Sequence, residues 1–187
     1  MALPVPEEAG ALLQARLEPL RDRHASPRWI PARHLHLTLV FIGAVAPQDV
    51  PRIRASMGAV AARHDVIEIT LGTGSGIARR DEGGVAWLTV SVGGASIVRL
   101  AEDLRQELLA RSASRRTLDD RPESWRPHMT VARRASTALI TELQDLPVPV
   151  DPVSWRADSV VLFRSHQGPP GARYEPVAVS PLRAGNA

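Results

Sequence analysis

The sequence predicts one domain of mixed helices and strands, built from two related halves. Segments of helical periodicity alternate with short strand-like segments along the whole chain. Its 187 residues, 44% of them hydrophobic, suit a single domain or two tightly fused lobes with a packed core. A His-x-Thr element occurs in each half, at His36 and at His128. The spacing of the elements alone allows either an α/β or an α+β fold.

The first half is expected to form two helices and two strands. Residues 6–23 read as an amphipathic helix with a proline near its start and acids in its first turn. Apolar positions alternate over residues 34–42, which predicts a strand that ends at Gly43. A second helix is expected over residues 47–63, and a second strand over 66–71.

The GTGSG stretch at residues 72–76 follows that second strand. It lacks the G-x-G-x-x-G spacing of a nucleotide-binding loop, so we expect a flexible turn there.

The second half repeats the mixture of strands and helices. Leucines at helical spacing predict a helix over residues 95–111, followed by a polar loop over 112–124. A turn-rich connector, PVPVDP, occupies residues 147–152. The remaining expected elements are strands at 85–92, 125–132, 159–163 and 174–179, and a helix at 135–146.

The composition excludes several chemistries. The chain has no cysteine, which excludes a thiol nucleophile and cysteine-bound zinc. All 23 basic residues are arginine, so a P-loop lysine, a Schiff base and an adenylated lysine are excluded too. We attribute the arginine bias mainly to genomic composition, although guanidinium groups suit phosphate. The net charge of +3 permits an anionic partner without indicating one.

Nothing in the sequence predicts a membrane protein. No apolar run approaches the roughly 18 residues needed to cross a bilayer. The first ten residues, MALPVPEEAG, lack the basic region and apolar core of a signal peptide. We therefore expect a cytoplasmic protein, monomeric and without an obligate protein partner.

Each His-x-Thr element places an imidazole and a hydroxyl together. Side chains alternate faces along a strand, so His36 and Thr38 share one face while Leu37 points to the other. His128 and Thr130 are arranged in the same way. Two imidazoles, one neutral and one protonated, could remove a proton from an attacking water and give one to a departing sugar oxygen.

The two threonine hydroxyls could donate to the non-bridging oxygens of the phosphate between those imidazoles. In a single element, the alternative of a half-buried strand histidine bonded to a neighbouring hydroxyl would be preferred. The occurrence of both elements favours catalysis.

The flanks of both elements resemble a known family. Residues 28–45 (RWIPARHLHLTLVFIGAV), residues 125–134 (WRPHMTVARR) and the tail from residue 160 (VVLFRSHQGPPGARYEPVAVSPL) carry the likeness. They resemble the bacterial and archaeal RNA 2',3'-cyclic phosphodiesterases, also called 2'-5' RNA ligases, of the two-histidine phosphoesterase superfamily. The likeness covers nearly the whole chain from about residue 5.

The resemblance implies an α+β fold of two pseudo-symmetric lobes, with antiparallel sheets facing a central cleft and helices on the outside. Residues 1–187 would form one two-lobed phosphoesterase domain. The implied reaction hydrolyses a terminal 2',3'-cyclic phosphate of RNA to a 2'-phosphomonoester, and in reverse it could make a 2'-5' link. No cofactor and no metal are implied. The partners would be RNA ends or small cyclic-phosphate nucleotides.

The resemblance also implies a role for each site residue. His36 would donate a proton to the leaving 3' oxygen, and His128 would accept one from water. Thr38 and Thr130 would hold the phosphate, and Arg133 would add positive charge beside it.

One departure from the family concerns the N-terminus. Relatives begin with a short apolar strand before the first helix, and here only MALPV precedes that helix. We expect this strand to be missing, shortened or lost to the chosen start site.

The roles of several residues beside the motifs remain open. His34 and His36 could form a metal pair, although no third ligand has suitable spacing. Phe41 could stack on a base only across a strand bulge, so we expect it in the core. His24, His64 and His166 are expected at the surface or in loops, with the cleft as an alternative for His166. Solvated charge and contact with an RNA backbone are both open for three arginines that flank the motifs, Arg33, Arg126 and Arg134.

Two other functions remain open. One is the same chemistry on a small cyclic-phosphate nucleotide or a 2'-5' oligonucleotide. The other is a module that binds RNA ends without turnover, against which the two titrating histidines argue.

Overall fold

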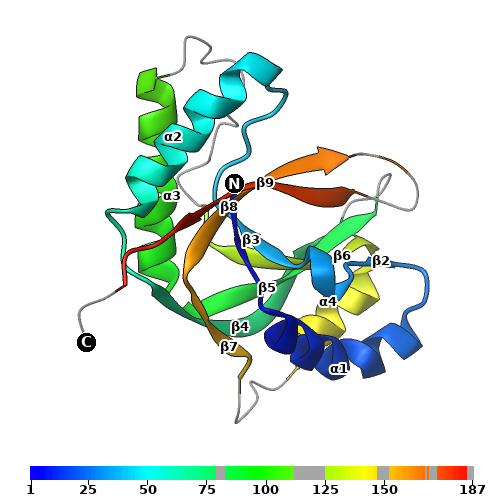
Figure 1. Cartoon of the computed structure of the whole chain (residues 1–187). Helices are drawn as coiled ribbons and strands as arrows, with labels where there is room; N and C mark the ends of the chain where they lie inside the picture. Colours follow the sequence, from blue (N-terminus) through cyan, green and yellow to red (C-terminus); the bar gives the residue numbers. More distant parts are fainter. Residues whose placement is uncertain (79–82, 112–124, 147–151, 167, 169–171, 185–187) are drawn as a thin grey trace.

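The computed structural model describes residues 1–78, 83–111, 125–146, 152–166, 168 and 172–184 (Figure 1). These residues form two antiparallel β-sheets and four α-helices, which confirms the α+β fold. None of the helices there has the length and hydrophobicity to span a bilayer. In chain order the elements are β1 (Ala2–Pro4), α1 (Glu7–Arg23), β2 (Arg28–Trp29), η1 (Ala32–His34), β3 (His36–Thr38), η2 (Pro47–Asp49), α2 (Val50–Ala61), β4 (Ile67–Ile77), β5 (Gly84–Val92), α3 (Gly94–Arg111), β6 (His128–Ala135), α4 (Thr137–Gln144), β7 (Ser154–Ala157), β8 (Ser159–His166) and β9 (Arg173–Pro181).

The first sheet, in the order β3-β1-β8-β9, joins both ends of the chain. Its strand β1 is the apolar strand whose presence the sequence left in doubt. It is present with three residues, because Leu3 pairs with Leu37 on one side and Ala2 with Val161 on the other. The short MALPV segment is therefore long enough to connect the first motif strand to the C-terminal hairpin.

The second sheet, in the order β2-β6-β5-β4-β7, comes from the middle of the chain apart from its edge strand β2. The duplicated motif suggested that each half of the sequence forms one sheet. The strand orders show instead that the first sheet combines strands from both ends of the chain. The C-terminal hairpin of β8 and β9 completes the sheet that the N-terminal strands begin.

The two sheets meet at the strands that carry the His-x-Thr elements, since β3 and β6 contact each other. Leu37 and Met129, which lie behind the two histidines, are buried in the same hydrophobic cluster. Helix α2 packs against α3 and the hairpin of β8 and β9, whereas α4 packs on β4 and β5. Figure 1 shows α2 and α3 side by side at the upper left and α1 and α4 together at the lower right.

The GTGSG stretch lies inside β4, so the predicted flexible turn is wrong. A Cβ atom on Gly74 would lie 2.2 Å from the backbone oxygen of Leu143 in α4, and one on Gly76 would lie 2.7 Å from Ile140. The glycines let the helix approach the strand closely, which strand periodicity alone cannot reveal.

Other predicted boundaries differ by a few residues. The strand expected over 34–42 is confined to β3, because a 3-10 turn precedes it and residues 39–43 leave the sheet. Ser136 caps α4 by accepting a hydrogen bond from the backbone N–H of Leu139 at 3.1 Å. The expected loop at 112–124 and all but the last residue of the expected connector at 147–152 lie outside the described residues.

Candidate active site

The two motif histidines are held in the same way. The Nδ1 atom of His36 bonds the carbonyl oxygen of His34 at 2.8 Å, and that of His128 bonds the carbonyl oxygen of Arg126 at 2.9 Å. A carbonyl can only accept, so each Nδ1 carries the hydrogen. Each Nε2 is left to exchange a proton, and each ring is anchored by the backbone two residues before it.

The side chains of both His-x-Thr elements alternate between the two faces of their strands, as the sequence predicts. In β3, His36 is half-buried and Thr38 exposed, while Leu37 is 1% exposed. In β6, His128 and Thr130 are half-buried, and Met129 is fully buried. Each imidazole thus shares a face with its threonine, with apolar packing behind it.

Arg133 joins the face of His128 because of a bulge in β6. By strict alternation, a residue five positions after His128 would point to the core. The register, however, passes from Thr130 opposite Trp87 to Ala132 opposite Ala86, and Val131 is skipped. The bulge resets the alternation, so Arg133 is exposed on the site face, opposite Val85.

Aromatic rings surround the two histidines. The ring of Tyr174 lies 4.6 Å from that of His36 in an edge contact, and Phe163 lies 5.9 Å from it. On the other sheet, the ring of Trp87 lies 5.5 Å from that of His128. The sequence patterns did not single out these three residues.

The rarity of tyrosine and phenylalanine could have identified two of them, Tyr174 and Phe163. The chain has one tyrosine and two phenylalanines, and the tyrosine and one of the phenylalanines contact His36.

Burial lowers the pKa of His36 below its usual value, and the bond to the His34 carbonyl opposes this shift. The positive charge of Arg133 lowers the pKa further, which also places Arg133 within electrostatic reach of His36. Burial, followed by the neighbouring Arg33, lowers the pKa of His34 as well. In the free protein His36 is therefore neutral near pH 7.

Phe41 is 59% exposed, so the prediction that it packs in the core is wrong. The chain leaves the sheet after Thr38, and the alternation on which that prediction depended no longer applies.

The remaining histidines each bond a carboxylate: His24 bonds Glu142, His64 bonds Asp103, and His166 bonds Glu175. His24 and His64, with side chains 15% and 14% exposed, lie in the loops that follow α1 and α2, which confirms the prediction of surface or loop positions for these two. His166, with a side chain 39% exposed, lies at the end of β8 in an ion pair.

The described residues offer no third ligand for a metal site at His34 and His36. Among the described residues, no group of three or more histidine, cysteine, aspartate or glutamate side chains could hold a metal ion.

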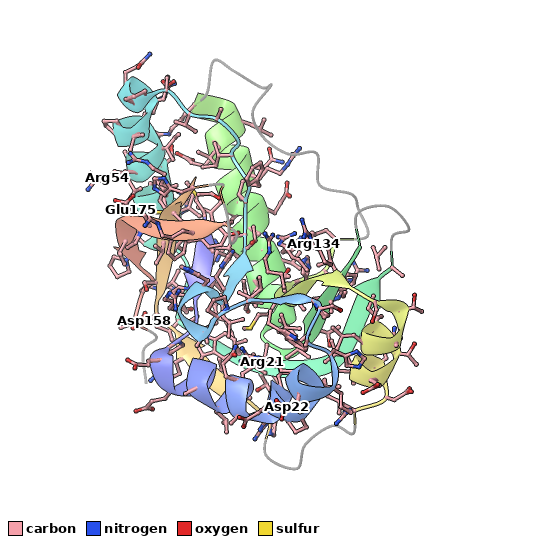
Figure 2. The ribbon with its side chains drawn as sticks, turned by 90° about the vertical axis from the view of Figure 1, so that its right-hand side faces the viewer. Arg21, Asp22, Arg54, Arg134, Asp158 and Glu175 are labelled. Carbon is pink, nitrogen blue, oxygen red and sulfur yellow. The ribbon has the colours of Figure 1, made fainter. Side chains whose placement is uncertain are left out.

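Two hollows of the described surface lie away from the histidines. One, of about 510 Å³, lies beside α1 and is lined by polar residues that include Arg21 and Asp22. In Figure 2 these two residues lie in the lower half of the view, below Arg134 at the end of β6. Neither this hollow nor the apolar one between α1 and β4 includes His36 or His128.

Comparison with known proteins identifies relatives over nearly the whole chain. The family model described as the 2'-5' RNA ligase superfamily matches residues 9–169. An RNA 2',3'-cyclic phosphodiesterase of Thermus thermophilus is 30% identical over 178 residues, which cover 91% of this chain and 82% of the relative.

Two solved structures are similar in fold. A crystal structure of a Thermus thermophilus protein has a TM-score of 0.74 and 25% identity, covering 99% of this chain and 97% of its own. Escherichia coli LigT complexed with 3'-AMP has a TM-score of 0.73 and 24% identity, covering 97% of this chain and 95% of its own.

Proposed function

The chain belongs to the 2'-5' RNA ligase superfamily, and from that premise we propose that it opens terminal 2',3'-cyclic phosphates of RNA by acid–base catalysis with His36 and His128. The observation that carries the proposal is the matched anchoring of the two imidazoles on contacting strands of different sheets. A module that only binds phosphate would not need two histidines with their Nε2 atoms left to exchange protons.

In the proposed reaction, a water oxygen forms a bond to phosphorus while the bond from phosphorus to the 3' oxygen breaks. His128 accepts the proton of the water on Nε2, and His36 donates a proton from Nε2 to the 3' oxygen. The product is a 2'-phosphomonoester with a free 3' hydroxyl. Attack by a 5' hydroxyl in place of water would give a 2'-5' link without ATP.

Thr38, Thr130 and Arg133 are proposed to hold the phosphate between the histidines. The hydroxyls would donate to the non-bridging oxygens, and Arg133 would stabilise the charge that builds on them. Since His36 is neutral in the free protein, the anionic phosphate must raise its pKa before it can act as the acid.

The test is turnover of a dinucleotide with a terminal 2',3'-cyclic phosphate in excess EDTA, with identification of the product. We expect the 2'-phosphate, and we expect His36→Ala and His128→Ala each to lower kcat by about 10²-fold or more. His64→Ala, which removes a histidine bonded to Asp103, is the matched control and should retain activity.

Loss of activity in EDTA would contradict the metal-independent mechanism. Tight binding of the dinucleotide without turnover by the native protein would favour a binding module instead.

A further inference from the structure

Tyr174 of β9 lies at the centre of a cluster of rings around His36. Its ring lies 4.6 Å from that of His36, 5.9 Å from that of His34 and 6.2 Å from that of Phe163. All three are edge contacts, which aromatic rings favour over face-to-face stacking. The side chain of His34 is therefore connected to the ring of His36 through Tyr174.

The geometry of the β8 and β9 hairpin brings Tyr174 to this place. Phe163 is two residues before Ser165 in β8, so both point to one face of the sheet, and Ser165 lies directly opposite Tyr174. Strand β1 pairs with β8 at Val161, before these rings are reached. The outer part of the hairpin thus extends past β1, where its rings contact His36.

The ring of His34 is held differently from those of the two motif histidines. The Nδ1 atom of each motif histidine bonds a backbone carbonyl oxygen, whereas the buried Nδ1 of His34 has no hydrogen-bond partner of normal geometry in the described structure. Burial lowers the pKa of His34, the charges of Arg33 and Arg173 lower it further, and the Arg33 backbone opposes the shift. The half-buried ring is therefore neutral near pH 7 and is held by packing against Tyr174.

Two separate parts of His34 act on His36. The carbonyl oxygen of His34 accepts the bond from Nδ1 of His36, and the imidazole of His34 contacts Tyr174, which in turn contacts His36. At the same position of the second element, Arg126 supplies the carbonyl oxygen for His128 but has no aromatic ring. A substitution of His34 changes the ring contact and leaves the backbone carbonyl in place, so the two effects can be separated.

We propose that His34 is a positioning residue whose ring holds Tyr174 edge-on against His36, so that Nε2 of His36 stays directed at the leaving 3' oxygen. The inference rests on the proposed function, because it concerns the histidine that would supply the proton. Without the His34 ring, Tyr174 and His36 gain freedom to turn. A displacement of about 1 Å at a reacting group can lower a rate by about 10²-fold.

The experiment uses two substitutions that separate the ring of His34 from its polarity. His34→Phe keeps a flat ring and loses the polar atoms, whereas His34→Gln keeps polar atoms and loses the ring. With the cyclic-phosphate dinucleotide, His34→Gln should lower kcat roughly tenfold and leave KM within about twofold of the native value. His34→Phe should restore most of kcat. His64→Gln, the same exchange at the histidine bonded to Asp103, is the control and should leave kcat unchanged.

A double-mutant cycle tests whether His34 acts through Tyr174. Tyr174→Leu should lower kcat by itself, and adding His34→Gln should lower it little further, because the connection is already broken. The imidazole C–H signals of His36 in NMR spectra give a readout that needs no turnover, since the ring current of Tyr174 shifts them. They should move in His34→Gln and move much less in His34→Phe.

An unchanged kcat in His34→Gln, an equal loss in His34→Phe, or additive losses in the double variant would overturn the proposal. Urea denaturation checks that each variant is folded, and His34→Leu, which also lacks the ring, replaces His34→Gln if that variant does not fold. If the native protein does not turn over the dinucleotide, the proposed function fails. The His36 signals then decide alone, and identical positions in the native chain and in His34→Gln would overturn the positioning role.

Discussion

His36 sits in a setting that opposes its charged form. Its ring is half-buried, contacts Tyr174 and Phe163, and lies within reach of the Arg133 charge. The bond from its Nδ1 to the His34 carbonyl favours the imidazolium but does not overcome burial. The proton that His36 is proposed to donate therefore depends on an anion in the site, which couples protonation to substrate binding.

This coupling predicts that His36 has one pKa in the free protein and a higher pKa in the ligand-bound protein. In the free protein its pKa should lie below the usual value of about 6.5, so the ring is neutral above that lowered pKa and charged below it. A bound nucleoside 2'-phosphate should raise the pKa, because its negative charge stabilises the imidazolium. NMR titration of the imidazole C–H signals, assigned with His36→Ala, measures both values. A free-protein pKa at or above 6.5, or no rise with ligand, would contradict this account.

At the scale of single elements, irregularities place the residues that regular periodicity cannot. The bulge at Val131 turns Arg133 onto the site face, and the glycines of β4 let α4 lie against the sheet. Both features combine a local departure from strand geometry with a contact made by another element.

Substitution of Gly74 tests whether the glycines of β4 serve to let α4 approach the strand or only to make the strand flexible. An added Cβ would lie 2.2 Å from the Leu143 backbone, so Gly74→Ala should lower the free energy of unfolding by about 1–3 kcal/mol. At Gly94, the first residue of α3, an added Cβ would have nothing within 4 Å, so Gly94→Ala is the control and should cost nothing. Urea denaturation of both variants measures the difference. Equal stabilities would mean that α4 is not held against β4 by this contact.

At the scale of the whole molecule, the two sheets share one hydrophobic cluster. Leu3 and Leu37 of one sheet belong to the same buried cluster as Met129 and Leu88 of the other. The first sheet also needs both chain ends, so it is not complete until β8 pairs with β1. We therefore propose that residues 1–187 form a single cooperative domain.

Cooperative unfolding can be tested with one probe in each sheet. Trp87 and Trp155 lie in the second sheet, so tryptophan fluorescence reports on it. The chain has no cysteine, and Val179→Cys on β9, 62% exposed in the native chain, would carry a single fluorescent label in the first sheet. The two urea midpoints should coincide. Two separate midpoints would indicate lobes that fold independently.

The predicted catalytic pairs and the chemistry available to them follow from the order of the residues alone. His36 with Thr38, and His128 with Thr130, share a face because side chains alternate along any strand, and the missing cysteine and lysine exclude whole reaction classes. The family likeness supplied the α+β class and the match to Arg133, which alternation alone would have turned to the core.

The folded chain was needed to show which strands meet, how both imidazoles are anchored, and which aromatic rings contact them. It was also needed to show that the GTGSG stretch belongs to a strand and that Phe41 is exposed. The physical reason is that these features depend on contacts between segments far apart in the chain. Local periodicity predicts the direction in which a side chain points, but it does not predict which residues from distant segments surround that side chain.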